Sequence, residues 1–280
     1  MAGRDGSART PLTRIALGRA RVVREVRAAA PLMADLAAPI PARGPWLTTV
    51  LNDQAAHRSP GVRPVAVVVE AHPQGRPDAV AFLTLRRRGW VTEVTLLGQG
   101  VGPVPPGRAP ARLLARNPVV AELLAEGVCG LLGSLRGPWR LRLTGLPLGD
   151  PTARALIARQ PDGLIGNERS SRLVDDLDGV GSVVRSRDPR ELERWLPQLL
   201  SREPDPRACG FLRAAARLHV AIAQVEVAVV ADGNALRAGL LTLVDGDDRW
   251  PWWGWTGIGG LGSEMGAPLV GLTAPVRRWP

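Results

Sequence analysis

The apolar residues of this chain form two similar series, and each series predicts the same small sheet. Short apolar runs bounded by Gly, Pro and Asp are typical of strands. The runs occur at residues 65–69, 79–85 and 91–97, and again at residues 225–230, 236–243 and 250–255. Equivalent landmarks such as Trp90 and Trp250 stand 160 residues apart. We therefore expect an internal repeat in which a three-strand antiparallel meander is built twice.

Helical spacing of apolar residues and N-cap residues followed by proline predict the helices. Asn117-Pro118, Asp150-Pro151 and Asp188-Pro189 supply such starts. The expected helices are residues 12–30, 46–56, 117–135, 150–160, 190–200 and 211–223, with further strands at 140–144 and 169–177.

This order of elements resembles the GNAT superfamily of N-acetyltransferases, and its doubling resembles the Fem-type aminoacyltransferases and the acetyltransferase-like proteins of bacterial polysaccharide pathways. The resemblance implies an α/β (α+β) fold with a mixed, largely antiparallel sheet flanked by helices. It also implies one full unit in residues 1–179 and a second, truncated unit in residues 180–280, because only 18 residues follow Gly262.

In that superfamily a loop with the pattern [QR]-x-x-G-x-[GA] binds the coenzyme A pyrophosphate through backbone amides at a helix N-terminus. Gln99, Gly100 and Gly102 match the start of this pattern, but Val104 stands where a small residue is expected. The second copy offers Gly257, Gly259 and Gly260. The resemblance thus implies acyl-coenzyme A as co-substrate. The alternatives are an anion site made by Arg108, Arg112 and Arg116, ordinary turns, or a flexible connection.

Acyl transfer to an amine needs a base that takes the amine proton. The candidates are Glu93 in the first meander, Glu226 in the second, and His219 on the helix before it. A solvated strand carboxylate, or a histidine used in packing, is the alternative for each. The superfamily often uses a tyrosine as acid, and this chain has none. We therefore consider an acyltransferase with a small-molecule acyl donor and an unknown amine acceptor, or a non-catalytic interaction protein on the same fold.

The segment Trp250-Pro251-Trp252-Trp253-Gly254-Trp255 is the densest aromatic cluster. Tryptophans at this density fill cores, form protein interfaces or stack on ligands. A homo-oligomer through residues 250–255 is one expectation. The interaction-protein hypothesis, which would use this tryptophan-rich meander, is motivated by the missing tyrosine, the interrupted glycine loop and the truncated second unit.

Composition narrows the remaining function classes. The chain has 280 residues, 45% of them hydrophobic, and a net charge of +10. Every basic residue is arginine, a bias typical of a GC-rich bacterial genome, so the charge is a weak indication of nucleic-acid binding, which we do not expect. The spacing of the three histidines and two cysteines predicts no metal site. We see no apolar run that could span a bilayer and no signal peptide, so we expect a cytoplasmic protein.

Overall fold

The computed structural model describes residues 11–57, 61–70 and 76–277. Its helices are α1 (Arg19–Ala28), α2 (Ala30–Asp35), α3 (Gly44–Ala56), α4 (Pro118–Ser134), α5 (Pro151–Ala158), α6 (Pro189–Leu200) and α7 (Pro206–Val220), with 3-10 turns η1 (Ile40–Ala42) and η2 (Leu177–Gly179). Its strands are β1 (Leu12–Leu17), β2 (Val62–Glu70), β3 (Ala79–Arg88), β4 (Val91–Leu96), β5 (Leu114–Ala115), β6 (Trp139–Pro147), β7 (Leu164–Glu168), β8 (Ser171–Asp175), β9 (Val183–Ser186), β10 (Val225–Asp232), β11 (Ala235–Asp245), β12 (Asp248–Thr256), β13 (Leu261–Met265) and β14 (Leu269–Arg277). Within these ranges no helix is long and apolar enough to cross a membrane.

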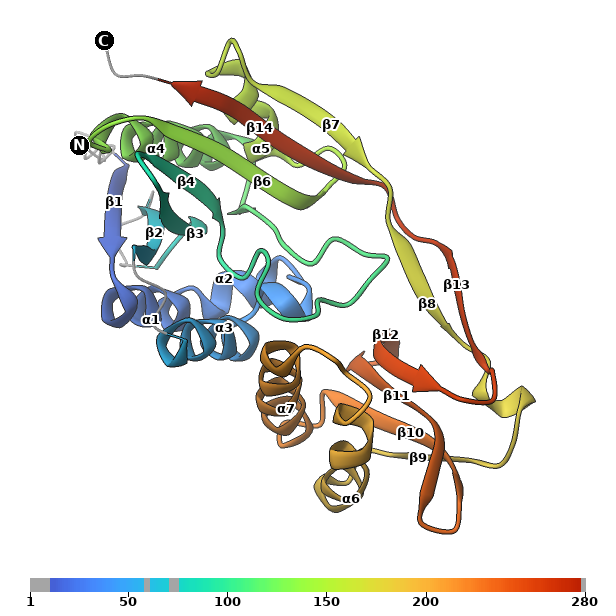
Figure 1. The fold of residues 1–280 in the computed structure, drawn as a ribbon. Coiled ribbons are helices and arrows are strands. Elements are labelled where there is room, and N and C mark those ends of the chain that lie inside the picture. Colours follow the sequence, from blue (N-terminus) through green and yellow to red (C-terminus); the bar gives the residue numbers. More distant parts are fainter. Residues whose placement is uncertain (1–10, 58–60, 71–75, 278–280) are drawn as a thin grey trace, which may run out of the picture.

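The first sheet has the strand order β1-β2-β3-β4-β6-β14-β7, and β5 pairs with β3. Helices α4 and α5 lie on one face, and α1 to α3 lie on the other (Figure 1). Strand β2 is buried on both sides, with Val65 and Val67 toward α4 and Ala66 and Val68 toward α1 and α3. This confirms the central strand predicted from its uninterrupted apolar run. The predicted α/β fold with a largely antiparallel, helix-flanked sheet is confirmed.

The second sheet has the order β12-β11-β10-β9 and packs against α6 and α7. Its succession of one strand, helices and a three-strand meander repeats the first sheet from β1 to β4. The pairing is equivalent too, because β9 lies antiparallel to β10 as β1 lies antiparallel to β2. The repeat in the apolar pattern therefore corresponds to a repeat in element order.

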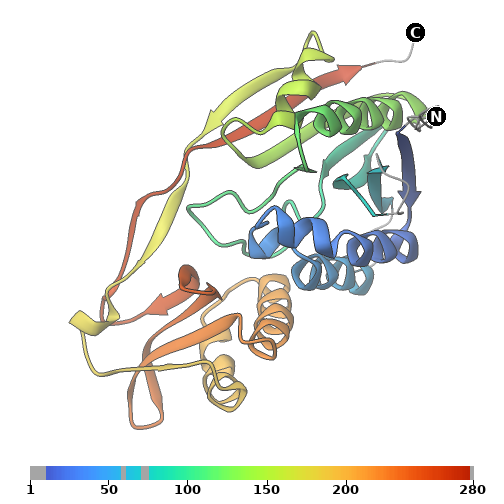
Figure 2. The same ribbon diagram turned by 180° about the vertical axis from the view of Figure 1, so that it is seen from behind.

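The C-terminal strands return to the first sheet. Strand β13 pairs with β8 in a two-stranded arm, and β14 lies between β6 and β7. Figure 2 shows this arm running from one sheet to the other. The sequence predicts a second unit over residues 180–280. The structure places Leu269–Arg277 of this range in the first sheet. The strands of the second sheet therefore lie, in sequence, between β8 and β13. The division at residues 179 and 180 stays a prediction.

The N-terminus differs from the predicted helix over residues 12–30. Residues Leu12–Leu17 form a strand that pairs with β2, and the helix begins at Arg19. The break falls at Gly18, whose φ of 92° is incompatible with a helix. Arg14 on this strand forms ion pairs with Glu25 and Glu70. Residues 1–10 lie outside the described residues.

Predicted helix starts are confirmed where an N-cap side chain is present. Asn117 Oδ1 accepts a hydrogen bond from the Val120 N–H at 3.1 Å, and Asp150 Oδ1 accepts one from Ala153 at 2.9 Å. Helix α7 begins at Pro206, before the predicted start at residue 211, because Asp205 caps it through the Arg207 N–H at 2.9 Å.

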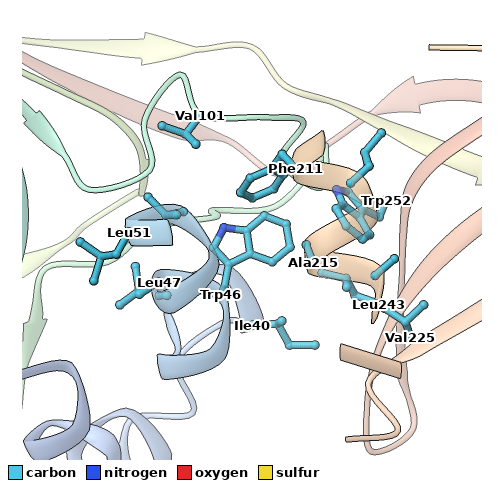
Figure 3. Close-up of a cluster of buried hydrophobic side chains, with 14 of the residues drawn as sticks. Ile40, Trp46, Leu47, Leu51, Val101, Phe211, Ala215, Val225, Leu243 and Trp252 are labelled. Carbon is cyan, nitrogen blue, oxygen red and sulfur yellow. The ribbon is translucent and has the colours of Figure 1, made fainter. Parts of the chain in front are cut away.

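The two sheets share one hydrophobic core. Trp46 on α3 lies at its centre, with ring centroids 5.4 Å from Phe211 on α7 and 5.3 Å from Trp252 on β12. Figure 3 shows these rings meeting between the helices of the two halves. Both Trp46 and Phe211 are fully buried. Because this core is continuous across both halves, their relative position is fixed by packing.

Candidate active site

Strands β4 and β6 run parallel and then separate, which opens the first sheet. They pair from Thr92 opposite Trp139 to Val94 opposite Leu141. Strand β4 nevertheless continues to Leu96, where it still pairs with β3, and β6 continues to Pro147, where it pairs only with β14. Among the described strands this is the only parallel pair. We call the opening beyond Val94 and Leu141 the strand gap.

The side chain of Gln99 lies in the strand gap. Its Oε1 accepts long hydrogen bonds from the Leu96 N–H on β4, at 3.4 Å, and from the Thr144 N–H on β6, at 3.3 Å. Two backbone donors on separated strands therefore converge on a single acceptor. Buried backbone N–H groups need a partner, so a ligand atom that replaced Gln99 Oε1 would find two donors already oriented.

Two cavities meet at the strand gap, and Gln99, Gly100 and Thr144 line both of them. The first, which we call the apolar cavity, has a volume of about 250 Å³ and is walled mainly by side chains such as Trp46, Phe82 and Leu97. The second, the polar cavity, has a volume of about 420 Å³ and lies over β3, β4 and β6. The gap therefore joins an apolar and a polar compartment.

Glu93 lines the polar cavity, as its place on the predicted meander suggested. Its side chain is 14% exposed, and its Oε2 lies 3.1 Å from Arg88 Nε. Glu93 stands opposite Arg140 in the paired part of β4 and β6, one residue before Val94, the last paired residue of β4. A carboxylate in this position can accept a proton from a group bound in the polar cavity.

The predicted phosphate loop after β4 divides into two parts. Gln99 and Gly100 line both cavities, and a Cβ on Gly100 would meet nothing within 4 Å. Gly102 instead packs against α7, because a Cβ there would lie 2.2 Å from Phe211 Cδ1. Gly102 therefore allows the loop to approach α7 closely. Cofactor binding by these three residues stays a prediction.

Of the three arginines considered as an anion site, two have carboxylate partners. Arg108 pairs with Asp248, and Arg116 pairs with Asp35 and Asp78. Arg112 lines the apolar cavity and donates to the Leu36 carbonyl at 2.9 Å. It forms no salt bridge within the described residues.

The glycines of the second copy lie at the turn from β12 to β13. A Cβ on Gly260 would lie 2.6 Å from Val180 Cγ2, and the Gly260 carbonyl accepts a hydrogen bond from Asp176 at 2.9 Å. The Gly257 N–H donates to Arg237, and the Gly259 carbonyl accepts from Thr256. These contacts connect the second sheet to η2 and the arm. None of the three glycines lines either cavity, and phosphate binding by them stays a prediction.

Glu226 is held by arginines. Arg249 donates to both of its carboxylate oxygens, at 2.7 and 2.5 Å, and Arg185 and Arg187 each lie 3.9 Å away. The Glu226 side chain is 8% exposed. Both carboxylate oxygens are thus occupied by Arg249, so the contacts favour a structural role, and the base role of Glu226 stays a prediction.

His219 is fully buried on α7, between the two halves. Burial lowers the pKa of its imidazole, while its Nδ1 hydrogen bond to Gln224 Oε1, at 3.0 Å, acts in the opposite direction. Its ring centroid lies 5.8 Å from that of Trp46, and Nε2 has no partner among the described residues. Burial without access to either cavity argues for packing, the alternative that the sequence left open, and the base role stays a prediction.

The tryptophans of β12 are used within the chain. Trp250 Nε1 donates to the Pro106 carbonyl at 2.7 Å, and Trp252 Nε1 donates to the Pro103 carbonyl at 3.0 Å. Both rings are buried. Trp253 donates to Glu203 at 2.9 Å, and Trp255 stacks under Arg202. These contacts favour core packing for the tryptophan cluster, because they hold the loop after β4 against β12. Oligomerisation through residues 250–255 stays a prediction.

Several site residues were not singled out from the sequence. Thr144 and Arg142 lie on β6, which was predicted only as a strand with one polar face, and that alternation was the available signal. Glu168 lines the apolar cavity, where its Oε2 accepts from the Gly145 N–H at 3.0 Å. No local pattern marks Glu168. No group of three or more His, Cys, Asp and Glu able to hold a metal occurs among the described residues.

Comparisons with known proteins give only remote matches. No family model matches the chain, and no curated protein matches its sequence. A tandem GNAT protein from the clavulanic acid biosynthesis pathway is 16% identical, with 85% of this chain and 76% of that chain covered and a TM-score of 0.34. A conserved protein of unknown function from Enterococcus faecalis V583, described as a probable N-acyltransferase, is 8% identical, with coverage of 94% and 72% and a TM-score of 0.30.

A third solved structure, a GCN5-related N-acetyltransferase from Sphaerobacter thermophilus, is 12% identical, covers 96% of both chains and has a TM-score of 0.33. These three structures are thus described as a tandem GNAT protein, a probable N-acyltransferase and a GCN5-related N-acetyltransferase. At these TM-scores the likeness adds nothing to the functional argument, which rests on the strand gap and the residues around it.

Proposed function

We propose that the protein is an acyltransferase of the GNAT superfamily, in the tandem arrangement, which transfers an acyl group from acyl-coenzyme A, or from an aminoacyl donor, to an amine. The observation that carries this proposal is the strand gap. It places two convergent backbone donors, those of Leu96 and Thr144, between an apolar and a polar cavity. The predicted cytoplasmic location belongs to the same proposal.

The residues present suit an acyl-coenzyme A donor. Its pantetheine arm is an extended chain with two amides, and such a chain can hydrogen-bond to strands that have lost their neighbour. The Leu96 and Thr144 N–H groups provide two donors once Gln99 moves aside. Arg112 at the apolar cavity, which has no carboxylate partner within the described residues, can pair with a phosphate.

The polar cavity would then hold the acceptor amine. Glu93 would take the proton as the amine nitrogen attacks the acyl carbonyl, and backbone N–H groups at the gap would stabilise the negative charge that develops on the carbonyl oxygen. The carbon–sulfur bond breaks, and the thiol leaves with a proton. The chain contains no tyrosine, and in this proposal Glu93 or water supplies that proton.

The interaction-protein alternative, motivated by the missing tyrosine, the interrupted loop and the truncated second unit, would bind its partner through the tryptophan-rich meander. The buried Trp250 and Trp252 rings, whose N–H groups bind the loop after β4, favour the enzyme.

Thiol release from acetyl-coenzyme A in the presence of an amine panel tests the proposal. We expect amine-dependent release by the natural protein, and a roughly 100-fold or greater loss with Glu93→Gln, since general-base catalysis contributes about that much. Glu264→Gln on β13, which removes an exposed carboxylate far from the gap, is the matched control. Equal rates for Glu93→Gln and the control would reject Glu93 as the base, and no release with any amine would reject the activity.

A further inference from the structure

The polar cavity is lined by four arginines and a single carboxylate. Arg86 and Arg88 come from β3, Arg142 from β6 and Arg207 from α7, and Glu93 is the acidic residue among them. These elements belong to both halves of the chain. Guanidinium groups in one cavity repel one another unless anions neutralise them. Four of them in one cavity therefore indicate a site for an anion.

Two of the four arginines have no carboxylate partner in the described part of the chain. Arg88 pairs with Glu93 at 3.1 Å, and Arg207 Nη2 lies 3.4 Å from Asp53 Oδ2. Arg86 and Arg142 form no salt bridge within the described residues. Arg185, by contrast, pairs with two aspartates. The polar cavity therefore gathers two guanidinium groups that have no carboxylate partner among the described residues.

Two buried polar atoms in the same cavity also lack hydrogen-bond partners among the described residues. Gln54 Oε1 and Arg207 Nε are buried, and neither has a hydrogen-bond partner in the described part of the chain. Gln54 Nε2 makes a long contact of 3.4 Å with Thr84 Oγ1. Buried polar atoms without partners are rare and suggest a missing ligand or water.

We infer that the polar cavity binds a small ligand with a carboxylate or phosphate group, and that the acceptor amine of this protein carries such a group. Guanidinium forks match both oxyanions. The oxyanion would pair with Arg86 and Arg142, which directs the amine at the other end of the ligand toward Glu93 and the strand gap. The acceptor role rests on the proposed function, whereas the binding of the anion does not.

The cavity volume is compatible with such a ligand. Small-molecule sites occupy about 300 to 1,000 Å³, and the polar cavity measures about 420 Å³. An amino acid or a phosphorylated amino alcohol fits within this range.

Ligand-observed NMR titration with matched amines tests the inference without measuring activity. The pairs are β-alanine against propylamine, and O-phosphoethanolamine against ethanolamine, so that the two arms separate carboxylate from phosphate. We expect at least one anionic amine to bind roughly tenfold or more tightly than its neutral partner, and Arg86→Gln and Arg142→Gln each to remove most of that difference, as expected for charge-assisted hydrogen bonds.

Arg87→Gln is the charge-matched control, because Arg87 is the exposed neighbour of Arg86 on β3 and does not line the polar cavity. Thermal unfolding of each variant verifies that it is folded, and the exposed Arg142 gives a second variant if Arg86→Gln is unstable. Equal affinity for anionic and neutral amines, no binding of any of the four, or full binding by both variants would overturn the inference.

Acetyl-coenzyme A titrated into the same samples separates the two proposals. If anionic amines bind in an arginine-dependent manner but acetyl-coenzyme A does not bind, the anion site stands and the acyltransferase proposal fails. If acetyl-coenzyme A binds and only neutral amines are acylated, the anion inference fails and the acyltransferase proposal stands.

Discussion

The two meanders have the same order of elements but different neighbours. In the first sheet, β4 lies beside the parallel strand β6 and parts from it after three residue pairs. In the second sheet, the equivalent strand β12 is an edge and has no such neighbour within that sheet. The strand gap and its two convergent N–H groups therefore belong to the first half, as does most of the lining of the two cavities, to which α7 of the second half adds Arg207.

The carboxylates show the same contrast. Glu93 faces a cavity and has one ion-pair partner, Arg88, whereas Glu226 is almost completely buried under a bidentate arginine. The second sheet instead contributes support, through Trp250 and Trp252, which bind the loop after β4. A repeated meander preserves a scaffold, but the chemistry depends on the strand placed next to it.

Substituting the two glutamates should separate catalysis from stability. Glu226→Gln breaks a charge-assisted bidentate pair and leaves Arg249 without its partner, so we expect the free energy of unfolding to fall by about 2 to 3 kcal/mol. Glu93→Gln breaks an ion pair with the largely exposed Arg88, so we expect a smaller loss of stability, of about 1 kcal/mol or less, while it abolishes most amine-dependent thiol release. Urea unfolding and the thiol assay measure the two effects. Loss of thiol release in Glu226→Gln, with thiol release retained in Glu93→Gln, would place the chemistry in the second half.

Substituting two glycines of the loop after β4 should have different effects on the stability of the protein. Gly102→Ala places a methyl group against Phe211, so we expect it to destabilise the protein by about 2 kcal/mol or more. Gly100→Ala adds only the cost of a φ of 74°, about 1 kcal/mol, because no atom lies within 4 Å of the new Cβ. Denaturant midpoints provide the comparison. A larger loss for Gly100→Ala would contradict the packing described for the loop.

The buried histidine predicts a smaller, pH-dependent effect. Burial lowers the pKa of His219 in the folded protein, so between that value and its ordinary pKa near 6.5 the unfolded chain binds more protons. Stability contributed by the neutral His219 should therefore be lost as the pH falls below about 6.5, by about 1 kcal/mol between pH 7 and 5.5. His219→Asn keeps a donor toward Gln224 and should flatten this decline. An unchanged pH profile would exclude His219 as its source.

Local patterns predicted the elements better than the site. Alternation and continuous apolar runs located both meanders, and the side chains of Asn117 and Asp150 fixed helix starts, because these signals act within a few residues. Strand β1 was misread as helix because its pairing with β2, more than 40 residues away, decides its conformation. The position of β14 beside β6 likewise depends on long-range pairing that no local pattern records.

The site itself was predictable only in part. Glu93 and Gln99 were expected near an active site and do line the cavities. Arg142 and Arg207 belong to elements far apart in the chain and meet only through the fold. The glycine cluster at residues 257–260 resembled a phosphate loop, yet it supports a turn from the second sheet to the arm, since glycine suits both uses.

The central claim is that the strand gap of the first half holds the acyl donor, and calorimetric titration of coenzyme A into two matched variants tests it most directly. Thr144→Trp fills the gap, because Thr144 lines both cavities, whereas Thr92→Trp adds the same side chain where β4 and β6 are still paired. We predict that the natural protein and the Thr92 variant bind coenzyme A and that the Thr144 variant does not. A cooperative thermal unfolding transition verifies that the Thr144 variant is folded. Equal binding by both variants, or no binding by the natural protein, would contradict the claim.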